Sequence, residues 1–132
     1  MDFHVENIMA INDGTFALID FQDAMISWPA YDLVSLLQDA RFDVDFSMAK
    51  ELIKKYSDLN AYSYDMIYSD YNILGAQRNS RILGIFVRKY LKDGQDSYLK
   101  FLPLVLKYLD YNFSNVEALK PVRLWMQDKK IL

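Results

Sequence analysis

The pattern of apolar and polar positions changes once along the chain, near residue 28. Before that point, two short apolar stretches, residues 7–11 and 15–19, flank the turn sequence "NDG". Asn, Asp and Gly tolerate positive φ, so this segment predicts a β-hairpin. After that point, apolar residues recur three and four positions apart, the spacing of one face of an α-helix. The pattern therefore predicts one short hairpin followed by a helical bundle.

Proline and serine residues indicate where the first helices begin. Pro29 favours the first turn of a helix that continues to residue 41, because the amide that proline lacks would be unpaired there anyway. Ser47 is the expected N-cap of a second helix, since its hydroxyl can accept a hydrogen bond from an exposed backbone amide.

A long helix is predicted from about residue 64 to residue 91, ending at Gly94. Within it, Gly84 costs about 1 kcal/mol relative to alanine, so we expect close helix packing at this position. Pro103 predicts a kink or a new helix, and Pro121 predicts the start of a last short helix.

Composition and charge narrow the function classes. The 132 residues are 52% apolar and 15% aromatic, which is ample for one folded core. The net charge of −3 argues against nucleic acid as a partner. The absence of cysteine excludes a disulfide scaffold and thiolate chemistry. No apolar run approaches the ~20 residues of a membrane span, and no basic leader is visible, so we expect a soluble cytoplasmic protein.

Three oxygen-bearing side chains flank the predicted hairpin. Asp2 precedes it, Asn7 is its first residue at the spacing D-x-x-x-x-N, and Asp20 follows it. In phosphoryl transfer, one Asp accepts the proton of the acceptor hydroxyl, while an Asn and a second Asp hold Mg²⁺. The simpler interpretation is that these are turn and strand-end residues. That interpretation is favoured for the D-x-x-x-x-N spacing alone, and less so once the hairpin and the second Asp are included.

Three motifs follow one another in the first part of the chain: "DFHVEN", "LIDFQ" and "PAYDL". Together they resemble the C-terminal lobe of the aminoglycoside phosphotransferase family, whose pattern is H-x-D-x-x-x-x-N, I-D-[FW] and P-x-[YF]-D-L. Within that family the chain is most similar to bacterial cell-wall amino-sugar kinases, which phosphorylate N-acetylmuramate and N-acetylglucosamine. The resemblance implies a mainly α, protein kinase-like C-terminal lobe, with residues 1–132 as a single domain. It also implies transfer from ATP, with Mg²⁺, to a sugar or amino-sugar hydroxyl.

The resemblance also implies roles for individual residues. Asp2 would be the catalytic base, and Asn7 and Asp20 would be the Mg²⁺ ligands. Asp32 of "PAYDL" would be a buried support whose carboxylate accepts hydrogen bonds from the catalytic-loop backbone, because a buried carboxylate needs donors. An ordinary first-turn Asp, stabilised by the helix dipole, is compatible with that role.

Further polar residues are candidates for substrate contact, and each has a simpler interpretation. A loop histidine is often hydrogen-bonded to backbone, residues after a strand often face solvent, and polar residues in an amphipathic helix usually form its solvated face. The last interpretation is the favoured one for the two helical candidates. The five candidates are His4, Gln22, Asp23, Gln77 and Arg78.

The chain departs from the family pattern at its start. Met1 stands where the family has Arg or Gly, and the family's His before the catalytic Asp is absent. The four glycines are scattered and form no G-x-G-x-x-G loop, and no strand Lys precedes the catalytic loop. We therefore expect the N-terminal nucleotide lobe to be absent and the chain alone to be inactive. A split gene, a misassigned start codon or an engineered truncation would each explain this, and a separately encoded N-terminal lobe is a possible partner.

Two other interpretations stay open. The chain could be a decayed or repurposed kinase fragment that serves as a binding or self-association module, because loss of a docked lobe would expose an apolar patch and favour a homodimer. It could also be a kinase-like enzyme for a protein or choline acceptor. The absence of an A-P-E element argues against a protein kinase.

Overall fold

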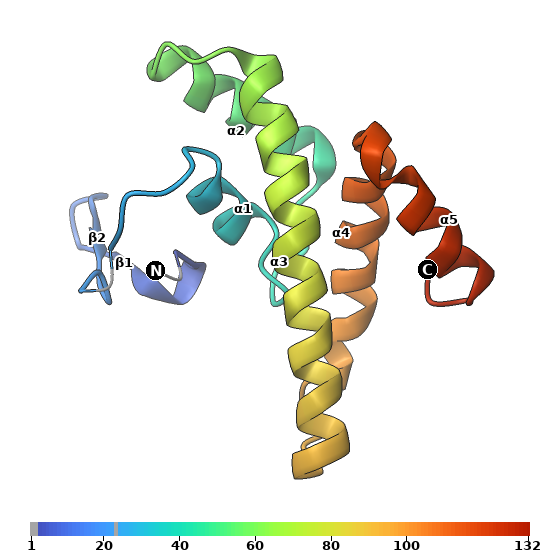
Figure 1. The fold of residues 1–132 in the computed structure, drawn as a ribbon. Coiled ribbons are helices and arrows are strands. Elements are labelled where there is room, and N and C mark those ends of the chain that lie inside the picture. The colour runs from blue at the N-terminus through green and yellow to red at the C-terminus, as the bar shows by residue number, and fades with distance from the viewer. Residues whose placement is uncertain (1–2, 23) are drawn as a thin grey trace.

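The computed structural model describes residues 3–22 and 24–132, and its elements follow the predicted order of a hairpin and then helices (Figure 1). The mainly helical fold class is confirmed. A short 3-10 turn, η1 (Val5–Asn7), precedes the two strands. The remaining elements are β1 (Ile8–Ala10), β2 (Phe16–Leu18), α1 (Tyr31–Leu37), α2 (Phe46–Leu59), α3 (Tyr64–Asp93), η2 (Leu99–Phe101), α4 (Leu102–Asn115), η3 (Glu117–Leu119) and α5 (Lys120–Asp128).

Helix α3 runs through the middle of the molecule, and α4 packs along it (Figure 1). The hairpin and α1 lie on one side of α3, and α5 lies on the other. One apolar cluster joins α1, α2 and the first half of α3, with Val34, Ile53 and Tyr71 at its centre. A second joins α3, α4 and α5 around Leu109 and Met126. The two clusters hold the bundle together without the hairpin.

The predicted start of the long helix near residue 64 and its stop at Gly94 are confirmed. The Ser63 side chain accepts a hydrogen bond from the backbone amide of Met66 at the N-terminus of α3. Gly94 ends the helix with a φ of 67°, a left-handed conformation that glycine adopts without steric cost. Pro103 and Pro121 each lie in the first turn of a helix, as expected of a residue without an amide hydrogen.

Two predicted boundaries were wrong. Helix α1 ends at Leu37 rather than residue 41, because the Asp39 carboxylate accepts a hydrogen bond from the Arg41 amide and holds a turn that competes with the helix. Helix α2 is capped by Asp45 rather than Ser47: the Asp45 carboxylate accepts the Ser47 amide at 2.7 Å. An Asp at this position is an equally good cap and starts the helix earlier.

The expected close packing at Gly84 is also wrong, since a Cβ there would meet no atom within 4 Å. The tightly packed glycine is Gly75, which lies earlier in α3. A Cβ on Gly75 would lie 2.6 Å from the Asn112 amide nitrogen and 2.7 Å from the Gln38 amide oxygen. Glycine is therefore needed at residue 75 to leave room for side chains from α4 and from the end of α1.

Those side chains form a fully buried amide cluster of Gln38, Asn79 and Asn112. Gln38 Nε2 donates to Asn112 Oδ1 at 3.0 Å, and Gln38 Oε1 accepts from Asn79 and Asn112 at 2.6 and 2.8 Å. Buried amides that are hydrogen-bonded to one another impose a specific geometry, because breaking any of these bonds is costly. The cluster therefore fixes the C-terminal end of α1 against α3 and α4.

Within residues 3–22 and 24–132, no helix has both the length and the apolar character needed to cross a membrane.

Candidate active site

The open end of the hairpin brings two of the predicted site residues together. Strands β1 and β2 are antiparallel, with Ile8 opposite Leu18. One step beyond this pair, the Ile19 amide donates to the Asn7 carbonyl oxygen at 3.0 Å. Asn7 thus ends η1 beside the residue that precedes Asp20. The hairpin carries these two side chains to the same end of the ladder from positions 13 residues apart in sequence.

Asp20 has an unusual backbone conformation, with a φ of 58°. Non-glycine residues rarely adopt positive φ, although Asp tolerates it better than most. Its carboxylate accepts a hydrogen bond from Gln22 Nε2 at 2.5 Å. Strained backbone of this kind persists where the surrounding structure holds it, and it is concentrated at functional sites. Gln22 thus contacts the carboxylate of a predicted metal ligand.

His4 lies on the inner side of the same loop, with its side chain only 15% exposed. Its Nε2 is 3.4 Å from the Asn7 amide nitrogen. Its Nδ1 is 4.0 Å from a Glu6 carboxylate oxygen and is buried without a hydrogen-bond partner among the described residues. The imidazole therefore packs against the side chain of Asn7 and faces the acidic residue next to it.

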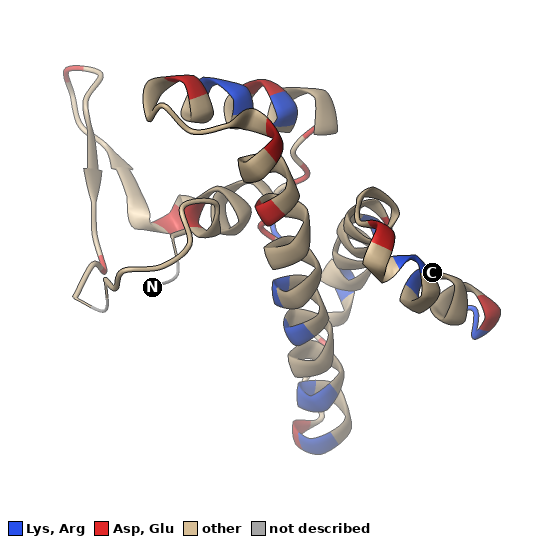
Figure 2. Cartoon of the chain, turned by 45° about the horizontal axis from the view of Figure 1, so that its top comes forward, with Lys and Arg blue, Asp and Glu red and all other residues tan. Residues whose placement is uncertain are grey.

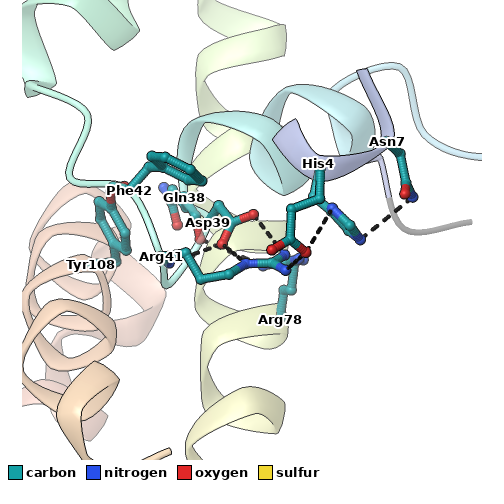
Figure 3. Close-up of polar contacts among 9 residues, drawn as sticks. His4, Asn7, Gln38, Asp39, Arg41, Phe42, Arg78 and Tyr108 are labelled. Atoms are coloured by element: carbon teal, nitrogen blue, oxygen red, sulfur yellow. Dashed lines mark hydrogen bonds and ion pairs between the residues drawn. The ribbon is translucent and has the colours of Figure 1, made fainter. Parts of the chain in front are cut away.

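A chain of charged side chains joins this loop to the helical bundle (Figure 3). Arg41 donates to Asp39 through its backbone amide, Nε and Nη2 at 2.8–2.9 Å, and its Nη1 donates to Glu6. Asp39 is 2% exposed. Burial alone would raise the pKa of Asp39, but the hydrogen bonds and charge of Arg41 outweigh it and hold that pKa below its ordinary value.

Two predicted residues, Asp2 and Asp23, lie outside the described residues. Asp32 differs from its expectation: its side chain is exposed, not buried. It lines a hollow of about 360 Å³ together with Trp28, Tyr31 and Tyr56. As the second residue of α1 it sits in the first turn, where the helix dipole favours a carboxylate without any need for burial.

The two helical candidates face different sides of α3. Arg78 is buried, and its Nη1 donates to the Gln38 carbonyl oxygen at 3.5 Å. It also lines a small hollow of about 160 Å³ beside Tyr31 and Arg81, and Figure 3 shows it near His4 and Arg41. Gln77 instead lines a hollow with residues of α4 and α5. Adjacent residues on a helix point about 100° apart, so the structure separates this pair.

Sequence reasoning missed the aromatic hollow and the Glu6–Arg41 contact. The first could have been suspected from "SWPAYD", where aromatic residues flank an acid at the start of a helix. The second joins residues 35 positions apart and leaves no local signal.

A comparison with protein families addresses the same segment of chain. The phosphotransferase enzyme family matches residues 1–65, from the loop before the hairpin to the start of α3. The match covers just under half of the 132 residues. The family resemblance predicted from the three motifs is thereby confirmed.

The similarity to curated relatives extends over most of the chain. The N-acetylmuramate/N-acetylglucosamine kinase of Caulobacter vibrioides is 35% identical over 94% of this chain and 35% of its own length. The corresponding kinase of Neisseria meningitidis serogroup B is 35% identical over 82% of this chain and 34% of its own length. The corresponding kinase of Pseudomonas aeruginosa is 25% identical over 83% of this chain and 34% of its own length. The chain spans about a third of the length of these curated relatives.

Proposed function

We propose that this chain is the catalytic and acceptor-binding lobe of an ATP-dependent phosphotransferase for a sugar or amino-sugar hydroxyl. The observation that carries the proposal is the Ile19–Asn7 hydrogen bond, which joins the loop before the hairpin to the strand end that leads to Asp20. The family match and the kinase relatives support the same reaction class. The names of those relatives suggest N-acetylmuramate or N-acetylglucosamine as the acceptor.

The proposed Mg²⁺ ligands are Asn7 and Asp20. An amide oxygen and a carboxylate are hard donors, the type that Mg²⁺ prefers, so the residues fit the ion. No group of three His, Asp or Glu side chains suited to a metal occurs in residues 3–22 and 24–132, and the proposed pair does not require one. When bound, Mg²⁺ would bridge phosphate oxygens and offset the charge that develops on the transferred group.

The other proposed roles concern the acceptor. Asp2 takes the proton of the attacking hydroxyl, a contribution typical of a general base. The hollow lined by Trp28, Tyr31 and Tyr56 suits a sugar ring, because aromatic faces pack against its C–H bonds while Asp32 can accept from a hydroxyl. Its volume of about 360 Å³ lies within the range of small-molecule sites.

Four further residues are proposed to lie beside the reacting groups: His4, Gln22, Asp23 and Arg78. His4 and Gln22 each contact one of the two proposed metal ligands through a side-chain hydrogen bond, which would limit the ligand's rotation. Gln77, on the other side of α3, is given no such role.

ATP binding is proposed to require a nucleotide-binding lobe that acts together with these 132 residues, in the same or a separate polypeptide. The 132 residues contain no glycine-rich phosphate loop, and positioning of the phosphates is most of the catalysis in this chemistry. The chain alone would then transfer phosphate negligibly. Use of ATP favours the cytoplasm as the place of action.

The test is phosphate transfer from ATP to N-acetylglucosamine and N-acetylmuramate. The 132-residue chain is assayed alone and mixed with the N-terminal part of the Caulobacter vibrioides relative. We expect Mg²⁺-dependent transfer in the mixture only. Asp2→Asn should lower the rate of transfer by about 100-fold or more. Asp110→Asn, which removes an acid on α4 far from the hairpin, is the matched control. Equal rates for Asp2→Asn and Asp110→Asn would contradict the proposal.

A second candidate function is a binding or self-association module. It is favoured by the exposed apolar side chains of the hairpin and the segment after it: Phe16 is 70% exposed and Ile26 is fully exposed. Exposed patches of this kind often mark contact surfaces. Sedimentation of the chain over a hundredfold concentration range tests it. Dimerisation together with no transfer in the mixture would favour this function over the enzyme.

A further inference from the structure

We infer that Arg41 is a positioning residue: by binding Glu6 and the buried Asp39 at once, it holds the metal-binding loop, residues 4–7, on the helical bundle. The inference rests on the proposed function, because it concerns how Asn7 is held in that site. We call the three side chains Glu6, Arg41 and Asp39 the loop tie. Arg41 and Asp39 are labelled in Figure 3.

The inner end of the loop tie is rigid. Asp39 is 2% exposed and accepts three hydrogen bonds from Arg41, from the backbone amide, Nε and Nη2. A buried carboxylate without donors would be unstable, so the guanidinium is held in one orientation by the group it satisfies. Its remaining nitrogen, Nη1, then points in a fixed direction.

Asp39 is itself fixed by the bundle. It follows Gln38, whose side chain belongs to the buried amide cluster with Asn79 and Asn112. The Gln38 carbonyl oxygen also accepts from Arg78 on α3. Two sets of contacts therefore fix the position of Asp39: those of its own side chain and those of the neighbouring Gln38. The contacts of Gln38 are with α3 and α4.

The outer end of the loop tie reaches the site. Arg41 Nη1 donates to Glu6, which is 60% exposed and directly precedes Asn7. The Asn7 amide donates to the His4 carbonyl oxygen at 2.9 Å, and the Asn7 carbonyl oxygen accepts from Ile19. A displacement of Glu6 therefore moves the first proposed metal ligand directly and the strand end before Asp20 through one hydrogen bond.

Strand pairing does not attach the loop to the bundle within residues 3–22 and 24–132. Strands β1 and β2 pair with each other in a sheet of two strands, and the side chains of η1 include none that is fully buried. A loop whose side chains are at most partly buried depends more on polar contacts for its position. Catalysis by positioning is sensitive to shifts of about an ångström, so the loop tie is expected to affect metal binding more than folding.

The experiment uses Glu6→Ala rather than a change at Arg41. Loss of Arg41 would leave the Asp39 carboxylate buried and unpaired and would risk unfolding the chain, whereas Glu6 is an exposed partner. The 132-residue chain is titrated with Mn²⁺ as a paramagnetic substitute for Mg²⁺, and broadening of the Asn7 and Asp20 NMR signals is followed. Hydrogen exchange at the Asn7 and Ile19 amides is measured in the same samples.

We expect Glu6→Ala to weaken Mn²⁺ binding about 10-fold, the effect typical of losing a group that orients a metal ligand. Exchange at the Asn7 and Ile19 amides should become faster, while the urea midpoint of unfolding stays the same. Glu6→Gln keeps an acceptor of the same length and should recover part of both effects. Asp110→Asn, which breaks a comparable pair with Arg123 between α4 and α5, should change neither.

The outcomes separate the two claims. Unchanged exchange and unchanged Mn²⁺ affinity in Glu6→Ala would overturn the loop tie. The urea midpoint of Glu6→Ala could instead fall in proportion to its losses of Mn²⁺ affinity and exchange protection. The contact would then be an ordinary stabilising one, and the loop tie would also be overturned. Faster exchange at Asn7 and Ile19, in a chain whose Asn7 and Asp20 signals Mn²⁺ never broadens, would support the tie and refute the proposed metal site.

Discussion

The hairpin region and the α3–α4 pair distribute their residues in opposite ways. Between residues 8 and 19 the hairpin has one charged residue, and Figure 2 shows it almost without coloured segments, yet it exposes large apolar side chains such as Phe16. The helix pair carries many charges on its surface but buries Asn79 and Asn112, together with Gln38 from the end of α1. Soluble domains usually do the reverse, with apolar residues inside and amides outside.

This difference separates two tasks. The buried amides are all held by specific hydrogen bonds, so they define how α1, α3 and α4 meet. The hairpin lacks such constraints, and most of its large apolar side chains are exposed. The bundle therefore acts as the frame, and the hairpin carries the proposed chemistry. Arg41 connects the two.

The largest expected effect comes from replacing the same residue type in the two regions. Gln38→Leu removes three hydrogen bonds and leaves the Asn79 and Asn112 amides buried and unpaired, so we expect a loss of about 3 kcal/mol in the free energy of unfolding. Gln22→Leu, next to Asp20, should cost less than about 0.5 kcal/mol because the side chain is exposed. Urea denaturation measures both. Equal losses would show that the hairpin is as tightly specified as the bundle.

Two glycines of one helix give the next largest effect. Gly75→Ala would bring a Cβ to 2.6 Å from Asn112 and should cost about 1–3 kcal/mol, because the amide cluster has to shift. Gly84→Ala meets no atom within 4 Å and should stabilise the chain by about 0.5–1 kcal/mol through helix propensity. Thermal unfolding of both variants tests this. A stabilising Gly75→Ala would mean that the buried amides are mobile.

The glycine pair also illustrates what the sequence could predict. The hairpin and the end of α3 follow from local signals, namely the "NDG" turn and Gly94, because those residues act on their own backbone. Close packing is a property of two surfaces. The sequence indicated that a mid-helix glycine needs a reason, but assigning that reason to Gly75 required knowing which face of α3 meets α4.

The candidate site divides in the same way. Asn7 and Asp20 could be paired from sequence because a hairpin has a fixed geometry and joins the two ends of its strands. The family resemblance implied burial for Asp32, and the structure exposes it. The contact between Glu6 and Arg41 bridges 35 residues and depends on where α1 ends, which the Asp39 turn determines. The pattern of apolar and polar positions in the sequence does not predict such a contact.

The pH dependence of the loop tie is the third prediction. The pKa of Asp39 is held below its ordinary value of 3.8 in the folded state. The stability it contributes is therefore complete above about pH 4 and is lost as the pH falls through the lower folded-state pKa. NMR titration of the Asp39 carboxyl carbon should give a midpoint below 3.8, and Arg41→Gln should raise it, since burial is then less opposed. A wild-type midpoint above 3.8 would contradict the geometry of the pair.

The smallest expected effect on stability lies in the hairpin. Phe16 is 70% exposed, so Phe16→Ser removes little buried apolar area and should change the free energy of unfolding by less than about 0.5 kcal/mol. Its effect should appear in association instead, because an exposed aromatic side chain in a region almost without charge favours contact with another surface. Sedimentation should therefore show less self-association in Phe16→Ser, with an unchanged urea midpoint. A large loss of stability would mean that the hairpin packs on the bundle in solution, and the contrast between frame and hairpin would then no longer hold.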